Sequence, residues 1–243
     1  MTAPTPKDQL YVKPLDTIED FVFDEQVADV FPDMLLRSIP GYRHIIHNIG
    51  ILGAEYAQAD TTLYDLGCSL GAATLSMAHR IDFANPVIAV DNAEAMVRQC
   101  RQRIKQSKVK NVEVLCADIR AVDISNASVV VVNFTLQFIP PEERLKLLQK
   151  IFRGLVPGGC LILSEKISFD DTEEAQFNEA MHHAFKRANG YSNLEISQKR
   201  TALEKVLICD SLPDHQQRLR QAGFAKHRVW FRCFNFASMI AIK

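Results

Sequence analysis

Between residues 62 and 166 the sequence alternates short apolar runs with amphipathic segments, and this alternation limits the possible folds more than any other feature. The apolar runs are continuous, as in 128-SVVVVNF-134, which is typical of a strand buried on both faces. The amphipathic segments carry apolar residues at helical spacing, as at Leu145, Leu148 and Phe152. Because parallel strands covered by helices on both faces give this pattern, we predict an α/β protein with a mostly parallel sheet.

The predicted elements extend beyond this region toward the C-terminus. We place strands at 62–66, 86–91, 112–118, 128–134 and 160–166. We place helices at 72–82, 93–107, 141–155 and 214–223. Residues 228–242 follow as two further strands joined by a short turn, which favours an antiparallel hairpin. The predicted sheet therefore has seven strands, mostly parallel, with an antiparallel C-terminal hairpin.

A chain of 243 residues suits a single domain with a substantial core. Residues 1–18 are polar and contain proline, so we predict a flexible tail there and one domain over 19–243. Helical patterns occur in 19–60, and the strand-free segment 170–210 is polar and helical. We expect both segments to form a helical cap on the sheet.

Composition excludes several classes of protein. The formal net charge of −1 gives no broad electrostatic attraction for nucleic acid. No apolar run approaches the length that spans a bilayer, and the N-terminus lacks the apolar segment of a signal peptide. The cysteines are scattered without a CxxC pair, which predicts reduced thiols in a cytoplasmic protein and no zinc site.

The stretch 62-TLYDLGCSLGAATLS-76 carries the first functional signal. An acid at the end of a strand, then a turn with Gly67 and Gly71, then a helix, is a pattern used to bind nucleotides. The helix N-terminus offers unpaired N–H groups to anionic atoms. A plain turn between a strand and a helix is the other interpretation, and the motif alone does not decide between them.

Further polar residues follow the neighbouring strands. Asp91 lies 20 residues beyond Gly71, the spacing of an acid that binds ribose hydroxyls, although Asp91 or Asn92 also suits the cap of the next helix. Asp118 and Asn133 end the third and fourth strands. Since ligands bind outside the carboxyl ends of the strands in such sheets, we expect these side chains to converge with Asp91 on one rim.

Together these motifs resemble the class I S-adenosylmethionine-dependent methyltransferases. The resemblance covers residues 60–166, includes LVPGGCLILSE before the fifth strand, and extends to the hairpin 228–242. It implies a Rossmann-like methyltransferase fold with S-adenosylmethionine as ligand. Because this ligand has no pyrophosphate, a serine at position 69 is tolerable where dinucleotide sites often have glycine.

A narrower resemblance covers nearly the whole chain. Runs such as FDEQVADVFPDMLLRSIPGY, VVNFTLQF and MHHAFKRANGYSNLEISQKR are similar to those of the carboxy-S-adenosyl-L-methionine synthase family. That family converts S-adenosylmethionine and prephenate to carboxy-S-adenosylmethionine and phenylpyruvate. The product serves a second enzyme, which carboxymethylates hydroxyuridine at the tRNA wobble position. The resemblance implies the same reaction here, performed by a homodimer without direct binding of nucleic acid.

By this resemblance ten residues line the ligand: Tyr42, Gly67, Cys68, Ser69, Asp91, Asn92, Asp118, Ile119, Asn133 and Arg200. Two of them are implied to be catalytic. The planar guanidinium of Arg200 suits the added carboxylate, in its own chain's site or across a dimer interface. Tyr42 can pack on the ligand or donate to its carboxylate. From the residues alone, Arg200 is more simply a solvated helix arginine and Tyr42 an ordinary helix residue.

The predicted cap is basic, with cationic or titratable side chains at His182, His183, Lys186, Arg187, Lys199 and Arg200. A local positive field would help to capture prephenate, which is a dicarboxylate. Most of these residues also fit a charged helix face in solvent. The two adjacent histidines face different directions on a helix, so we predict no metal site.

The implied reaction needs no evident general base. Prephenate loses carbon dioxide and hydroxide as its ring becomes aromatic, the hydroxide takes a proton from the sulfonium methyl group, and that carbon captures the carbon dioxide. The protein would hold the reactants, exclude water and stabilise charge. A conventional small-molecule or tRNA methyltransferase and a non-enzymatic S-adenosylmethionine-binding protein are the alternatives.

Overall fold

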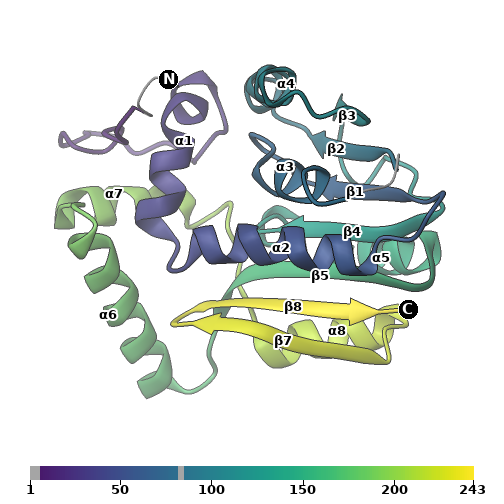
Figure 1. Ribbon diagram of the computed structural model, residues 1–243. Helices are drawn as coiled ribbons and strands as arrows, with labels where there is room; N and C mark the ends of the chain where they lie inside the picture. The colour runs from purple at the N-terminus through teal and green to yellow at the C-terminus, as the bar shows by residue number, and fades with distance from the viewer. Residues whose placement is uncertain (1–5, 82–84) are drawn as a thin grey trace.

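The computed structural model describes residues 6–81 and 85–243 and contains the predicted sheet (Figure 1). Seven strands pair in the order β3-β2-β1-β4-β5-β8-β7, and β8 runs antiparallel to both of its neighbours, β5 and β7, while the other pairs are parallel. Their bounds are β1 (Thr62–Leu66), β2 (Val87–Asp91), β3 (Val112–Cys116), β4 (Ala127–Asn133), β5 (Leu155–Ser168), β7 (Lys226–Cys233) and β8 (Phe236–Ile242). The predicted fold class is confirmed.

One short strand, β6 (Asp210–Ser211), was not predicted. It pairs in parallel with Ile167 and Ser168 of β5. This pairing is possible because β5 runs two residues beyond its predicted end at residue 166. The strand was missed because two residues are too few to leave a periodic signal in the sequence.

Helices cover both faces of the sheet. Their bounds are α1 (Glu25–Ser38), α2 (Tyr42–Tyr56), α3 (Ala72–Ala78), α4 (Glu94–Ser107), α5 (Pro141–Gly154), α6 (Thr172–Ala188), α7 (Asn193–Leu203) and α8 (Leu212–Ala222), with a 3₁₀ turn η1 (Leu136–Phe138). Helices α2 and α3 pack on one face, and α5 and α8 on the other (Figure 1). The four consecutive valines of β4, residues 129–132, alternate between these two cores, which explains their continuous apolar run.

Helix α2 lies on the sheet and not in the predicted cap. Its buried residues Ile45 and Ile49 pack in the same core as β1 and β4. Its glycines allow close approach to α3, because a Cβ at Gly50 would lie 2.3 Å from the hydroxyl of Ser76. Apolar and small residues on one helix face therefore direct α2 to the sheet, and the N-terminal contribution to the cap is α1 with the segment before it.

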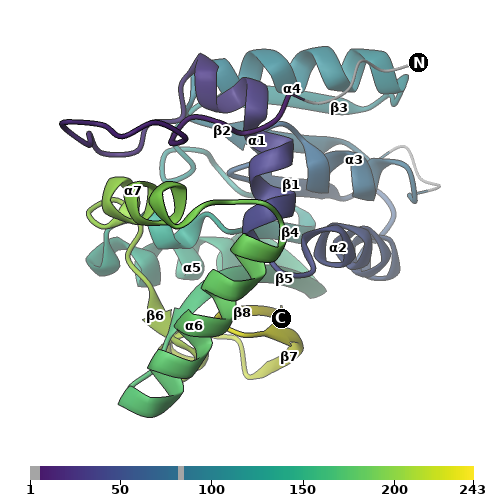
Figure 2. The ribbon, with the colours of Figure 1, turned by 90° about the vertical axis from the view of Figure 1, so that its left-hand side faces the viewer.

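The cap consists of α1, α6 and α7 beyond the carboxyl ends of the parallel strands (Figures 1 and 2). Side chains of Asp24, Asp171 and Ser192 accept N–H bonds at the first turns of these helices, which fixes where each begins. Asp8 is buried against the cap, and Gln198 of α7 bonds the backbone at Leu15. Residues 1–5 of the predicted tail lie outside the described residues, and its flexibility stays a prediction.

Small differences concern the ends of elements and one thiol. Helix α3 stops at Ala78, and the predicted end at residue 82 lies outside the described residues. Strand β3 ends at Cys116, so Asp118 lies in the following loop. Cys116 is exposed, at the last position of this edge strand. Among the described residues, no helix is long and apolar enough to cross a membrane.

Candidate active site

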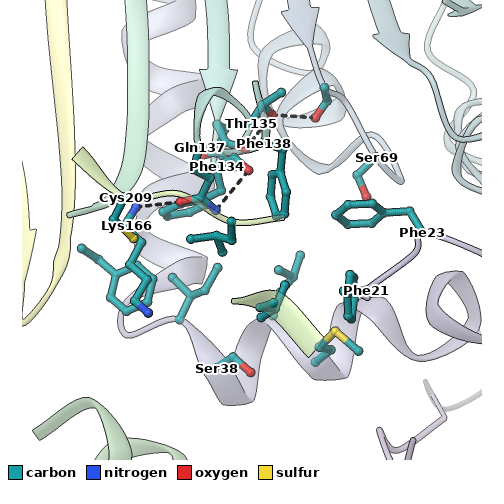
Figure 3. A pocket seen from close by; sticks show the side chains of 18 of the residues that line it. Phe21, Phe23, Ser38, Ser69, Phe134, Thr135, Gln137, Phe138, Lys166 and Cys209 are labelled. Atoms are coloured by element: carbon teal, nitrogen blue, oxygen red, sulfur yellow. Dashed lines mark hydrogen bonds between the residues drawn. The ribbon is translucent and has the colours of Figure 1, made fainter. Parts of the chain in front are cut away.

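A cavity of about 660 Å³ lies between the carboxyl edge of the sheet and the cap (Figure 3). Its volume suits a small-molecule ligand. All ten residues predicted from the sequence line it: Tyr42, Gly67, Cys68, Ser69, Asp91, Asn92, Asp118, Ile119, Asn133 and Arg200. In Figure 3, Ser69 and Lys166 lie on opposite sides of the hollow, with Gln137 and Phe138 between them. The convergence of these residues on one cavity agrees with the predicted site, and their contact with a ligand stays a prediction.

The turn after β1 requires glycine for a reason internal to the protein. Gly67 has φ 81°, a left-handed conformation that favours glycine. A Cβ there would lie 2.2 Å from the hydroxyl oxygen of Thr135. The N–H groups of Gly67 and Cys68 both donate to the carbonyl of Val90, which ties the turn to β2. The turn is thus held in one shape before any ligand binds.

Asp91 joins this turn to the start of α4. Its carboxylate accepts from the backbone N–H of Ser69 at 2.8 Å and from that of Ala93 at 2.9 Å. Burial raises the pKa of Asp91, and these hydrogen bonds oppose the rise. Asp91 therefore orders the backbone that leads into α4 and lines the cavity, but it is not the cap of this helix, because the N-cap is Ala93 and no side chain caps it.

Asp65, at the end of β1, holds the next helix in place. Its side chain is 1% exposed and accepts from the backbone N–H of Thr74 at 2.9 Å and from the hydroxyl of Thr74. Burial raises the pKa of Asp65 to about 6. The carboxyl group fixes α3 relative to β1 and so supports the turn between them.

At the far end of this rim, Asp118 and Ile119 follow β3. The Asp118 carboxylate accepts from the backbone N–H of Arg120 at 2.8 Å and also pairs with the Arg120 guanidinium. These bonds lower the pKa of Asp118. Ile119 is buried and gives the cavity an apolar wall. A charged acceptor beside an apolar wall suits an adenine ring and its amino group.

The middle of the cavity has a free acceptor and a strained backbone. The Oδ1 atom of Asn133 is buried and has no hydrogen-bond partner within residues 6–81 and 85–243. The next residue, Phe134, has φ 57°, an unusual value for an aromatic residue. An orphaned acceptor here fits a ligand that carries an ammonium group, as S-adenosylmethionine does.

The two residues predicted to be catalytic differ in their settings. Burial raises the pKa of the Tyr42 phenol, which therefore stays protonated, and its ring lies 6.5 Å from that of Phe134. Arg200 lies at the rim with its side chain 67% exposed, and it pairs with Glu179 at 2.7 Å. Tyr42 can thus donate a hydrogen bond inside the cavity, whereas Arg200 must leave Glu179 to contact a ligand.

Sequence reasoning missed several residues that line the cavity near the end of β5. Gln137 accepts from the backbone N–H of Lys166 at 3.0 Å. The adjacent Glu165 is fully buried and accepts from the N–H groups of Leu136 and Gln137, which fixes η1. Burial raises the pKa of Glu165 to about 8. Charged residues near the end of an otherwise apolar strand, as in the run SEK, were the available signal.

The parallel sheet, the closing hairpin and the turn between β1 and α3 define the class I methyltransferase fold. A family model described as "Methyltransferase domain" matches residues 63–159. Human N-acetylserotonin methyltransferase, solved in complex with SAM, aligns over 90% of this chain with a TM-score of 0.62 and 14% identity. An O-methyltransferase family protein from Burkholderia thailandensis aligns over 91% with a TM-score of 0.65. This chain spans 55% and 60% of those two chains, and the likeness shows the fold.

Two curated relatives identify the family. A protein of Citrifermentans bemidjiense named carboxy-S-adenosyl-L-methionine synthase is 58% identical, over 97% of this chain and 98% of its own length. A protein of Citrobacter koseri with the same name is 54% identical, over 98% of this chain and 97% of its own length. The chain belongs to the carboxy-S-adenosyl-L-methionine synthase family and is a transferase that uses S-adenosylmethionine.

Proposed function

We propose that this protein converts S-adenosylmethionine and prephenate to carboxy-S-adenosylmethionine, phenylpyruvate and water. The main support is that similarity to the synthases extends over 97% of the chain and therefore includes the cap. A relative that shared only the methyltransferase domain would support S-adenosylmethionine binding and leave the second substrate open. The cap forms one wall of the cavity, so a shared cap favours a shared second substrate.

The sheet edge would hold the adenosyl part of the substrate. Asp91 can accept from the ribose hydroxyls, and Asp118 from the adenine amino group. The free Oδ1 of Asn133 is placed to accept from the ammonium group. These roles use acceptors that the structure already directs to the cavity.

The reaction balances without a further reactant. The prephenate dianion gives phenylpyruvate, carbon dioxide and hydroxide. The hydroxide and a proton from the sulfonium methyl group form water, and the methyl carbon gains the carbon dioxide as a carboxylate. The residues of the cavity would bind both reactants in contact and keep out solvent water, which would otherwise disperse the carbon dioxide.

Arg200 is proposed to hold the new carboxylate, either in its own chain or across a dimer interface. In the structure its guanidinium pairs with Glu179 at an exposed position. A surface pair of this kind contributes about 0–1 kcal/mol, so exchange of Glu179 for a product carboxylate has a small energetic cost. Homodimeric assembly, a cytoplasmic location and supply of the product to a tRNA carboxymethyltransferase belong to the same proposal.

The test is incubation of the purified protein with S-adenosylmethionine and prephenate, followed by mass spectrometry. The proposal predicts equal amounts of phenylpyruvate and an adenosyl product heavier than S-adenosylmethionine by carbon dioxide. Unchanged S-adenosylmethionine in the presence of prephenate would contradict it. Formation of S-adenosylhomocysteine and a methylated acceptor would instead identify a conventional methyltransferase.

A further inference from the structure

Three lysines meet at the end of the cavity beneath the cap. Lys166 extends from β5, Lys186 from α6 and Lys199 from α7, and all three line the cavity. Lys186 is 8% exposed and Lys199 is 5% exposed. The three come from three successive elements of the chain, β5, α6 and α7, and the fold turns these elements toward one cavity.

This cluster lacks enough acidic partners. The Lys199 ammonium lies 3.5 Å from a carboxylate oxygen of Asp8 and makes no hydrogen bond within the described residues. The Asp8 carboxylate also accepts from the hydroxyl of Tyr191, so it is shared. The Lys186 ammonium lies 5.9 Å from the centre of the Tyr191 ring, and it has no ion pair or hydrogen bond in the part of the chain that the structure describes. Asp8 therefore neutralises at most one of the three charges.

Neighbouring titratable groups do not supply the missing negative charge. Glu179 pairs with Arg200 and lies 3.9 Å from His183, and Asp33 pairs with Arg37.

His182 is neutral, because burial lowers its pKa to about 3 and its ring bonds the carbonyl of Ser38 at 2.9 Å. The end of the cavity beneath the cap is thus a buried region of net positive charge.

Such a cluster is costly in the empty protein. An ammonium group without a partner loses its hydration on burial, and like charges repel. Burial and the neighbouring lysines lower the pKa of Lys186 to about 7, and burial lowers that of Lys199 to about 8. An anion bound among the lysines would remove this cost and return both groups to the charged form.

We propose that Lys166, Lys186 and Lys199 bind the pyruvyl carboxylate of prephenate, the one that remains in phenylpyruvate. This inference rests on the proposed function. The ring carboxylate leaves as neutral carbon dioxide, so cations held against it would stabilise the reactant more than the transition state. The pyruvyl carboxylate keeps its charge throughout and can be held without slowing the reaction. The lysines are therefore positioning and specificity residues for the second substrate.

The test measures binding without chemistry. Prephenate is titrated calorimetrically into protein saturated with S-adenosylhomocysteine, which has no methyl group to react. Lys186→Met is expected to raise the prephenate Kd about ten- to hundred-fold, the usual loss for a charged hydrogen bond. Affinity for S-adenosylhomocysteine should not change. Lys205→Met, at an exposed position outside the cavity lining, is the matched control and should bind prephenate like the wild type.

Two further measurements separate a binding role from a merely structural one. The inhibition constant of phenylpyruvate should rise in Lys186→Met by the same factor as the prephenate Kd. Titrations at pH 8 in two buffers of different ionisation enthalpy should show proton uptake in the wild type, and less in the variant. Lys166→Met, at a less buried position, serves the same test if Lys186→Met does not fold.

Unchanged prephenate and phenylpyruvate affinity in both lysine variants would overturn the subsite. A loss of S-adenosylhomocysteine affinity as large as the loss for prephenate would also overturn it, because the cluster would then hold the adenosyl ligand's own carboxylate. Failure of the proposed function is seen separately, as absence of the carboxylated product from the wild-type protein.

Discussion

The two ends of the cavity differ in how the chain builds them. The sheet end comes from turns that directly follow β1 and β2, and its key groups already bond one another, as Asp91 bonds the backbone at Ser69. The cap end brings together Lys166 of β5 and Lys186 of α6, and their charges are not balanced by nearby acids. The sheet end is preorganised by its own hydrogen bonds, whereas the cap end requires a bound anion to balance its positive charge.

This difference separates what is common to the fold from what defines the family. A turn held by internal hydrogen bonds can bind the adenosyl group in many enzymes with different second substrates. The buried positive charge of the cap end is expensive to maintain, so it is expected only where a specific anion binds. Under the proposed function, the second substrate is therefore selected at the cap end, where the sequence signal is weaker.

The largest expected effect is at the turn. Gly67→Ala places a Cβ 2.2 Å from Thr135 in a left-handed conformation. We expect a loss of roughly 3 kcal/mol or more in the free energy of unfolding, from backbone strain and overpacking together. Binding of S-adenosylmethionine should fall below detection in calorimetry.

The control for this variant is Gly158→Ala. Gly158 has φ 78°, but a Cβ there would lie 3.5 Å from the nearest atom, a side-chain nitrogen of Gln58. This variant therefore tests backbone strain without a steric clash. We expect it to lower the free energy of unfolding by about 1–2 kcal/mol and to retain ligand affinity. Equal losses in the two variants would show that Thr135 does not fix the turn.

The second effect tests the acid at the sheet end. Asp91→Asn removes the charge and leaves one acceptor oxygen where Ser69 and Ala93 now use two. We expect affinity for S-adenosylhomocysteine to fall by about 1.5–3 kcal/mol, or roughly ten- to hundred-fold, in calorimetric titration. Wild-type affinity in this variant would remove Asp91 from the proposed ribose contact.

The third prediction tests how much the burial of Lys186 at the cap end lowers the stability of the folded protein. The pKa of Lys186 falls from 10.5 to about 7 in the folded protein, so the unfolded chain binds more protons between these values. Its contribution to stability therefore rises with pH across that range and is most unfavourable below pH 7. Lys186→Met should be more stable than the wild type at pH 7, by about 1–3 kcal/mol.

The advantage of this variant should shrink as the pH approaches 10, and chemical denaturation of both proteins from pH 7 to pH 10 measures it. The difference between the two proteins is the relevant quantity, because other groups titrate in both. A variant that is less stable than the wild type at pH 7 would mean that Lys186 has a structural partner.

The smallest expected effect is at the rim. Arg200→Ala removes an exposed ion pair with Glu179 and should change the free energy of unfolding by at most about 0.5 kcal/mol. Carboxy-transfer activity should nevertheless fall if Arg200 holds the new carboxylate. Full activity in this variant would refute that role, and Lys205→Ala, at another exposed position, controls for the loss of a surface charge.

The sequence was sufficient for the sheet, because continuous apolar strands and amphipathic helices leave local periodic signals. The strand order was not predicted, because the pairing of distant strands leaves no local signal. The prediction that α2 belongs to the cap was wrong, because a helical period shows which face of a helix is apolar and not which element covers that face. Gly50 and Gly53 allow α2 to pack closely against α3, and this is a tertiary contact that the sequence pattern does not show.

The candidate site likewise contains residues that local sequence patterns could predict and residues that they could not. Residues at the ends of strands, such as Asp91 and Asn133, were predictable because parallel strands end at one edge. The cluster around Lys186 was not, since a buried lysine and a solvated one look alike in a sequence. Burial depends on how α6 packs against α1 and α7, and on how α7 packs against the N-terminal segment, including Asp8, and no local pattern records that packing.

The most direct test of a cavity with two separate binding ends is a paired titration of Asp91→Asn and Lys186→Met. Each variant is titrated with S-adenosylhomocysteine, and then with prephenate at saturating S-adenosylhomocysteine. We predict that Asp91→Asn weakens only S-adenosylhomocysteine and that Lys186→Met weakens only prephenate, each by at least about ten-fold. If both variants weaken the same ligand, or if Lys186→Met leaves prephenate binding unchanged, the division of the cavity into an adenosyl end and a carboxylate end is contradicted.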